Sequence, residues 1–385
     1  MADPTSSPSP ADRANAILAL DGGGVRGAIS IAFLQRLETL LRARDDAPDA
    51  RLSDYFDLIG GTSTGAIIAG AMALGQQVTE IHDAYRALAP RVFQRPPFRV
   101  AGLQAVFDAN RLRQEIRKVC GDQTLETADL KSCLAVVTKR MDTGSIWVVT
   151  SNPDGAFWDD DPAAGQIGNR HYRLADIIRA STAAPHFFEP EEIAIVDGQS
   201  PGLFIDGAIS PHNNPSLALL CAVTIPGHGF SWPTGRERLA MVSIGTGSFR
   251  PQLDALKARS MTSAGLAIRA LSGMIADGEQ SVLTQMQLLA ATDTPWVINS
   301  EIGDLGGFRL TPEPLLTYQR YNIRLDGKWL IDELATSLSG AAIDRLKRID
   351  DPGGLEVAFE LGQLAAEKFM IEDHLTLVRR REKAG

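Results

Sequence analysis

Residues 17–30 read ILALDGGGVRGAIS and predict a short apolar strand that runs into a glycine-rich turn and then a helix. Glycine has more backbone freedom than other residues and loses more conformational entropy on folding. Three consecutive glycines, at 22–24, are therefore expected where the backbone needs a positive φ or where another atom must approach it closely. Residues 57–69, DLIGGTSTGAIIA, repeat the strand, turn and helix plan with Ser63 at the apex. Together the two turns predict a single site, in which the first turn supplies hydrogen-bond donors and the second supplies a serine nucleophile.

The size and composition indicate a globular α/β protein. The chain has 385 residues, more than the roughly 250–300 at which one core usually stops growing, so one large domain or a domain with an extension is expected. Its 44% hydrophobic and 22% charged residues are typical of an enzyme rather than of a disordered or fibrous protein. The net charge of −9 argues against a nucleic-acid polymer as partner and against adsorption to an anionic membrane by charge alone.

The cysteines and the N-terminus favour a cytoplasmic protein. Cys120, Cys133 and Cys221 are odd in number and have no metal-ligand or redox spacing, so a disulfide framework is not expected. Residues 1–13 lack a basic region followed by an apolar one, and we expect a disordered tail there rather than a signal peptide. No run of about 18 apolar residues predicts a membrane span.

Strands and helices alternate at the spacing of a largely parallel sheet. We therefore expect a single domain over residues 14–385, with a mostly helical C-terminal portion from about 219. The expected strands cover residues 17–20, 56–59, 133–138, 146–150, 203–208 and 239–244. The expected helices cover residues 28–42, 64–74, 79–88, 110–119, 174–184, 216–223, 264–275, 280–291, 328–338, 341–349 and 355–370.

The second turn matches the G-x-S-x-G pattern, in which small flanking residues let a strand turn sharply into a helix and expose the serine oxygen. The pattern alone is more often a structural turn. Here it lies between an apolar strand and a helix of small residues, whose N-terminus would direct its positive end at Ser63. We therefore interpret Ser63 as the nucleophile.

The first turn is suited to an oxyanion hole. No side chain blocks approach to the backbone N–H groups of Gly23 and Gly24, and the amide of Thr64 would add a third donor. Residues 22–27 also satisfy G-x-G-x-x-G, the dinucleotide-binding pattern. That pattern expects an acidic residue at the end of a second strand about 20 residues later, whereas the acids between 45 and 49 fall in a polar loop.

Asp206 is the candidate general base. It ends an apolar strand and is followed by Gly207 and Ala208, which places its carboxylate at the same sheet edge as Ser63. Partial burial would raise the pKa of its carboxyl group above the reference value of about 3.9 and so make the carboxylate a stronger base. A role in a structural turn is the simpler explanation of this aspartate on local sequence alone.

A histidine base is the alternative. Serine hydrolases usually recruit one, and the chain order serine, aspartate, histidine is available with His212, His228 or His374. Of these, His212 has the most suitable surroundings.

Four segments together resemble patatin-like phospholipases: residues 21–27 (DGGGVRG), 61–65 (GTSTG), 180–188 (ASTAAPHFF) and 206–208 (DGA), in the family's order. The resemblance covers about residues 17–218, with only loose similarity at 239–247 and 318–325. It implies a three-layer α/β/α sandwich, a dyad of Ser63 and Asp206, and neither a catalytic metal nor a cofactor. It assigns the oxyanion hole to Gly22, Gly23, Gly24, Arg26 and Thr64. The further motif positions are Gly27, Gly61, Gly65, Gly207 and Ala208.

Two positions depart from the family's commonest pattern. Many members carry a glycine where this chain has Ala208, and His186 precedes the two phenylalanines of the third motif. Neither removes catalytic chemistry, although His186 leaves the role of histidine open.

The implied activity is hydrolysis of fatty-acyl esters of phospholipids or glycerides through an acyl-Ser63 intermediate. Membrane lipids are then the expected partners of a cytoplasmic protein peripherally associated with membrane. Some bacterial patatin-like proteins are latent toxins or defence effectors switched on by a cyclic nucleotide, so a small-molecule activator and a homo-oligomer stay open. Beside the triad esterase, the alternative from another class is a catalytically silent anion-binding module.

One basic segment has no place in this site. Arg91, Phe93, Arg95, Phe98 and Arg99 mix cations, aromatic rings and prolines in an otherwise acidic chain. This composition favours a lid that docks on anionic bilayers, with a packed surface loop as the simpler alternative.

Overall fold

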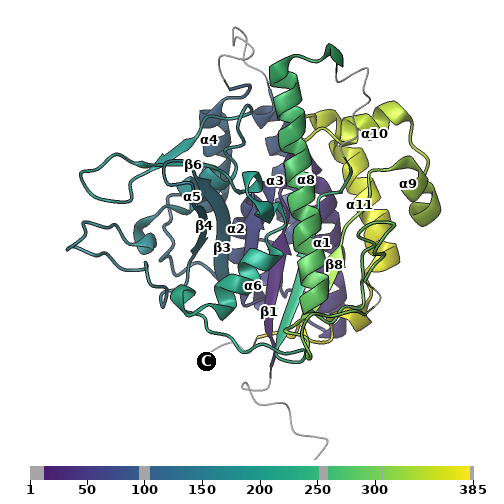
Figure 1. Ribbon diagram of the computed structural model, residues 1–385. Coiled ribbons are helices and arrows are strands. Elements are labelled where there is room, and N and C mark those ends of the chain that lie inside the picture. The colour runs from purple at the N-terminus through teal and green to yellow at the C-terminus, as the bar shows by residue number, and fades with distance from the viewer. Residues whose placement is uncertain (1–12, 95–104, 251–258, 306, 382–385) are drawn as a thin grey trace, which may run out of the picture.

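The computed structural model describes residues 13–94, 105–250, 259–305 and 307–381. Within these ranges one eight-stranded sheet has the order β5-β6-β3-β2-β1-β7-β8, and β4 pairs with β3 (Figure 1). The strands are β1 Asn15–Leu20, β2 Leu58–Thr62, β3 Cys133–Arg140, β4 Ile146–Thr150, β5 Glu191–Ile193, β6 Gly202–Asp206, β7 Leu239–Ile244 and β8 Thr317–Tyr321.

The centre of the sheet is parallel and one side is antiparallel. β3, β2, β1, β7 and β8 all run in the same direction. β4 and β6 run antiparallel to β3, and β5 runs antiparallel to β6. Central parallel strands are covered on both faces, which is why β1 reads as an unbroken apolar run in the sequence.

Helices cover both faces of the sheet and make the predicted three-layer sandwich. Along β1, Leu18 and Leu20 face the larger hydrophobic cluster, whereas Ile17 and Ala19 face the smaller one. In Figure 1, α6 and α8 lie in front of the sheet and α1 lies behind it. The helices are α1 Gly27–Arg44, α2 Thr64–Ala73, α3 Val78–Val92, α4 Ala109–Cys120, α5 Leu174–Ser181, α6 Ser216–Thr224, α8 Ser263–Leu289, α9 Gly327–Leu334, α10 Gly340–Leu346 and α11 Leu355–Phe369.

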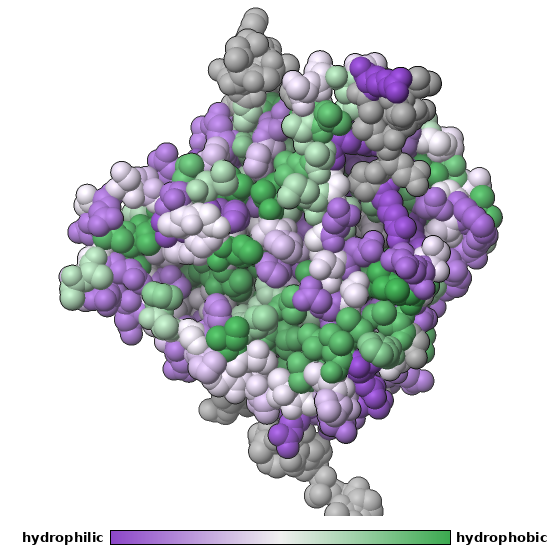
Figure 2. All heavy atoms as spheres, in the orientation of Figure 1, coloured by the Kyte–Doolittle hydropathy of each residue, from purple (hydrophilic) through white to green (hydrophobic). Residues whose placement is uncertain are grey.

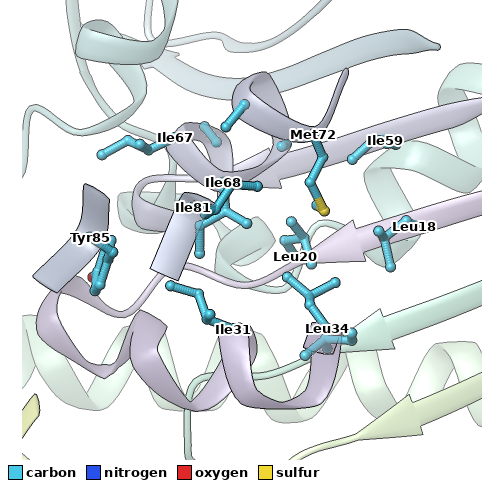
Figure 3. Close-up of a cluster of buried hydrophobic side chains, with 14 of the residues drawn as sticks. Leu18, Leu20, Ile31, Leu34, Ile59, Ile67, Ile68, Met72, Ile81 and Tyr85 are labelled. Atoms are coloured by element: carbon cyan, nitrogen blue, oxygen red, sulfur yellow. The ribbon is translucent and has the colours of Figure 1, made fainter. Parts of the chain in front are cut away.

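The larger cluster holds the two motif-bearing turns together. Figure 3 shows side chains of α1, α2 and α3 meeting those of β1 and β2, with Ile31, Ile68 and Ile81 among them. Every residue of α2 is buried, as its composition of small and aliphatic side chains predicts. The helix that follows Ser63 is therefore fixed on all sides.

Several elements differ from those expected from the sequence, among them β5, which was not expected at all. β8 lies in the portion expected to be mostly helical, between two expected helices, and was missed because its residues TYQRY include polar side chains that are nonetheless buried. One continuous helix, α8, replaces the two expected at 264–275 and 280–291. α3 continues to Val92 rather than ending at Leu88, so that Pro90 lies in the last turn of the helix.

Part of the basic segment belongs to packed structure. Arg91 lies at the end of α3, and its Nη1 is 3.6 Å from Glu115 Oε1. Phe93 packs edge-on against Phe107 with ring centroids 5.3 Å apart. These two residues are therefore not part of a separate lid. Residues 95–99 of the predicted lid, and almost all of the predicted tail at 1–13, lie outside the described residues.

None of the helices in the described ranges is both long enough and apolar enough to span a bilayer.

Candidate active site

Ser63 occupies a strained turn between β2 and α2. Its backbone has φ 54° and ψ −123°, a conformation that costs a non-glycine residue about 1–3 kcal/mol. A Cβ on Gly61 would collide with the backbone of Gly65, and one on Gly65 would collide with the carbonyl of Leu20. Both glycines are therefore required sterically for the chain to turn here and present the serine oxygen.

The Ser63 hydroxyl donates to Asp206 Oδ2 over 2.7 Å. The backbone N–H of Ala208 donates to Asp206 Oδ1 over 2.8 Å, so both carboxylate oxygens are held. Asp206 is only 3% exposed, and its burial raises the pKa of its carboxyl group to about 6, against the opposing effect of its two hydrogen bonds. Ala208 thus contributes its backbone amide, which holds the Asp206 carboxylate.

Asp206 reaches Ser63 from an antiparallel strand. β6 runs against β3, with Asp206 opposite Thr138, and the neighbouring Val137 lies opposite Thr62 on β2. The expectation that Ser63 and Asp206 share an edge of the sheet is confirmed. β6 begins beyond that edge and runs inward, so that its last residue, Asp206, lies level with the end of β2.

No histidine in the described part of the chain hydrogen-bonds to Ser63 or Asp206. His212 Nδ1 is buried without a hydrogen-bond partner there, and burial lowers the pKa of its imidazole. His374 Nδ1 lies 3.1 Å from the hydroxyl of Tyr321. His186 is exposed at the cavity wall, in a backbone conformation with φ 74°. The geometry thus gives the triad alternative no support.

The glycine turn presents two unpaired N–H groups, from Gly23 and Gly24. The carbonyl of Gly22 accepts from Thr246 Oγ1 at 2.8 Å, and the carbonyl of Gly23 accepts from the Arg26 amide at 3.2 Å. In a trans peptide the N–H points opposite to the C=O, so these bonds fix the N–H groups of Gly23 and Gly24. Within the described ranges neither N–H has an acceptor.

Gly22 has a different role from the one predicted. Its own N–H donates to the carbonyl of Asn213 over 3.1 Å, so this amide is occupied and cannot serve an oxyanion without breaking that bond. Gly22 contributes instead through its carbonyl, which accepts a hydrogen bond that positions the next amide. The sequence could not show this because Asn213 is distant in the chain.

Gly24 and Arg26 are both fixed by tertiary contacts. Gly24 has φ 56°, and its carbonyl accepts from the hydroxyls of Tyr85 and Thr64, the latter over 3.1 Å. Arg26 donates from Nη1 to the carbonyl of Gly247 over 2.8 Å, and its guanidinium lies 5.2 Å from the ring centre of Phe249. Burial lowers the pKa of Arg26 to about 10. The Arg26 side chain therefore stabilises the conformation of the glycine turn.

Gly27 and Gly207 are required by packing. A Cβ on Gly27 would collide with Thr64 Cγ2, and one on Gly207 would collide with the carbonyl of Val137. Both glycines let catalytic segments approach a neighbouring element closely, which explains their presence in the motifs.

A buried ionic cluster, consisting of Asp21, Glu279 and Arg320, lies directly behind the glycine turn. Arg320 donates to both carboxylate oxygens of Asp21, at 2.8 and 2.5 Å, and to Glu279 Oε1 at 3.2 Å. Its Nη1 also donates to Ser243 Oγ at 2.8 Å. Asp21 immediately precedes Gly22, so this cluster anchors the start of the turn. Arg320 and Glu279 were not predicted from the sequence, in which only the loose similarity at 318–325 pointed to this region.

A cavity of 520 Å³ opens onto Ser63, Asp206 and the glycine turn. Its walls are largely apolar, which suits a ligand with a hydrocarbon chain. The side chains that form these walls include Ile67, Leu88, Val92, Phe93, Leu112, Phe187, Phe188, Phe249, Ile268, Leu271 and Ile275.

The fold and the geometry are those of an α/β protein in which a serine at a sharp strand-to-helix turn contacts a buried aspartate. The chain belongs to the patatin-like phospholipase family, whose model matches residues 18–220, more than half of the sequence. The resemblance drawn from the four sequence motifs is thereby confirmed.

Individual relatives include two bacterial phospholipases. The chain is 30% identical over 211 residues to a cGAMP-activated phospholipase of Vibrio cholerae, covering 52% of this chain and 55% of that protein. It is 28% identical over 281 residues to a cUMP-AMP-activated phospholipase of Escherichia coli, covering 73% and 79%. The chain therefore spans little more than half of the first relative.

A solved structure shares the fold at low sequence identity. Human GIVD cytosolic phospholipase A2 aligns with a TM-score of 0.50 and 12% identity, over 97% of this chain and 60% of that one.

Proposed function

We propose that this protein is a lipid acyl hydrolase of the phospholipase A type, which cleaves fatty-acyl esters with Ser63 as nucleophile and Asp206 as base. The observation that carries the proposal is the 2.7 Å hydrogen bond from Ser63 Oγ to a buried Asp206, at the base of an apolar cavity. Family membership supports the same activity.

In the acylation step, Ser63 Oγ attacks the ester carbonyl carbon while Asp206 accepts the hydroxyl proton. The carbonyl oxygen becomes an oxyanion, which the N–H groups of Gly23 and Gly24 are positioned to bind, together with that of Thr64 at the start of α2. Asp206 then returns the proton to the leaving alkoxide oxygen as the ester C–O bond breaks. The products of this step are an alcohol, such as a lysophospholipid, and an acyl ester on Ser63.

In the deacylation step, Asp206 takes a proton from a water molecule, whose oxygen attacks the acyl-Ser63 carbonyl. Collapse of this second tetrahedral intermediate breaks the bond to Ser63 Oγ and releases the fatty acid, while Asp206 gives its proton to that oxygen. A carboxylate with its ordinary pKa is a weak base at neutral pH. The raised pKa of Asp206, about 6, makes it a stronger one, which suits a base that must act without a histidine.

Covalent labelling combined with lipid analysis tests the proposal. A fluorophosphonate should label the wild-type protein but not Ser63→Ala, because only an activated serine reacts. Wild-type protein should release fatty acid from phospholipid vesicles, and Ser63→Ala should not. A wild-type protein that is not labelled and releases no fatty acid, with cGAMP or cUMP-AMP present as well as without them, would favour the silent anion-binding module.

The same assay should be run with and without cGAMP and cUMP-AMP, since two relatives are named for activation by these molecules. We propose that activity depends on a small-molecule activator of this kind and that the protein acts in the cytoplasm at the membrane surface. Release that is equal in all arms would contradict activator dependence while leaving the hydrolase proposal intact.

The pH dependence of kcat should show Asp206 as a base. Its ionised form is the active one, so activity is expected to be constant above about pH 7 and to fall about tenfold per pH unit below the pKa near 6. This acidic limb of the pH profile is measured from steady-state rates on a soluble short-chain ester.

Glu279→Gln is the control for the pH profile, because Glu279 lines the same cavity and burial beside Asp21 raises its pKa to about 7. The limb should persist near pH 6 in this variant. If the limb disappears, the titrating group is Glu279 and the assignment to Asp206 is wrong.

A further inference from the structure

The N-terminal half of α8, residues 263–276, presents apolar side chains both to the catalytic cavity and to solvent. Ile268, Leu271 and Ile275 recur at helical spacing and line the catalytic cavity. Leu266 and Met274 do not line the cavity, and their side chains are 47% and 68% exposed. A surface helix normally presents charged residues to solvent. The exposed apolar side chains on the outer face of α8 therefore indicate that this face binds a partner.

The C-terminal half of α8 is anchored in the fold. Val282 and Met286 are buried in the smaller hydrophobic cluster, with residues of α6 and of the central strands. Glu279, midway along the helix, is held by Arg320. The half that covers the cavity is thus also the half with these exposed apolar side chains.

The charge of this stretch distinguishes it from the rest of the protein. Residues 259–276 contain no aspartate or glutamate and two basic residues, Arg259 and Arg269, in a chain of net charge −9. Figure 2 shows hydrophobic atoms along the upper part of α8. Apolar side chains combined with arginines are typical of helices that lie in the interface of an anionic bilayer.

We propose that residues 263–276 dock on a lipid bilayer, with Leu266 and Met274 inserted at the level of the acyl chains. Other side chains of the same helix line the cavity, so docking places the cavity beside the membrane from which a lipid would enter. The 14 residues extend about 21 Å at the rise of an α-helix, enough to lie along the membrane surface. The choice of a bilayer as partner rests on the proposed function.

Vesicle flotation tests the proposal, with Ser63→Ala as the background so that no lipid is consumed. The vesicles contain phosphatidylethanolamine and phosphatidylglycerol in equal amounts. Adding Leu266→Gln and Met274→Gln should lower the partition coefficient by about tenfold or more, because two apolar side chains no longer enter the bilayer. Vesicles of phosphatidylcholine alone should bind the unsubstituted protein more weakly, since they lack anionic charge.

The matched control is Val297→Gln with Leu310→Gln, whose side chains are 47% and 65% exposed but lie outside α8. This pair should bind vesicles as tightly as the background protein. Thermal unfolding midpoints of both pairs verify that each protein is folded.

Equal binding by the α8 pair and the control pair would overturn the proposal. So would conversion of a dimer to a monomer by the α8 pair without a change in vesicle binding, because the outer face would then contact a second copy. Binding is measured without turnover, so the result stands even if the wild-type protein hydrolyses no ester. Failure of the hydrolase proposal is therefore distinguishable from failure of this one.

Discussion

Replacing Asp206 with asparagine is expected to lower kcat for ester hydrolysis by about 10²- to 10⁴-fold. The asparagine side chain has nearly the same shape, but its amide cannot accept the proton that Ser63 Oγ loses as it attacks. The hydrogen-bonding position at 2.7 Å from Ser63 stays occupied, so the variant removes proton transfer and leaves the surroundings in place. Steady-state rates on a soluble ester measure the loss, and fluorophosphonate labelling should slow in parallel.

His212→Ala is the matched comparison, because it decides between a dyad and a triad. Asp206 and Ser63 contact each other directly, and the imidazole of His212 hydrogen-bonds to neither. We expect His212→Ala to retain kcat within roughly threefold, well short of the loss from removing a general base. A loss as large as that of Asp206→Asn would show that a histidine relays the proton and that the dyad is wrong.

Replacing Arg320 with methionine is expected to lower the free energy of unfolding by about 3–5 kcal/mol. The change removes the cation of this cluster and leaves the buried carboxylate of Asp21 and the partly buried one of Glu279 without their partner. The pKa of Asp21 is already raised by burial, and Arg320 opposes that effect. Urea denaturation followed by circular dichroism measures the difference.

Arg86→Met is the matched control for this prediction. Arg86 also pairs with a carboxylate, Glu356, at 2.7 Å, but both side chains are about half exposed. An exposed pair contributes about 0–1 kcal/mol, so the control should unfold almost as the wild type does. Equal effects of the two substitutions would mean that the buried cluster adds nothing beyond an ordinary surface contact.

The catalytic turns were predictable because their chemistry is local. The strand, turn and helix around Ser63 need small residues within a few positions, and the structure shows the collisions that larger ones would cause. Asp206 was found for a similar reason, since it ends a strand before a close approach at Gly207. The dyad geometry then follows from pairing these segments in one sheet.

The supporting contacts were not predictable because their partners are far apart in sequence. Arg320 and Asp21 are separated by 299 positions, and neither neighbourhood predicts the other. β8 went unrecognised because burial of Arg320 depends on that distant partner. For the same reason the sequence assigned the Gly22 amide to the oxyanion hole, whereas Asn213 occupies it.

The pairing of β1 with β7 sets a limit on how the protein can be cut. The family match ends at residue 220, but β1 is hydrogen-bonded along its full length, from Asn15 to Leu20, with β7, which lies beyond that point. A fragment truncated near 220 would expose β1 as an apolar edge strand, which invites aggregation. It would also leave Asp21 without Arg320. The end of the family match is therefore not a suitable end for an expressed fragment. A shortened form of the protein should retain the chain through β8.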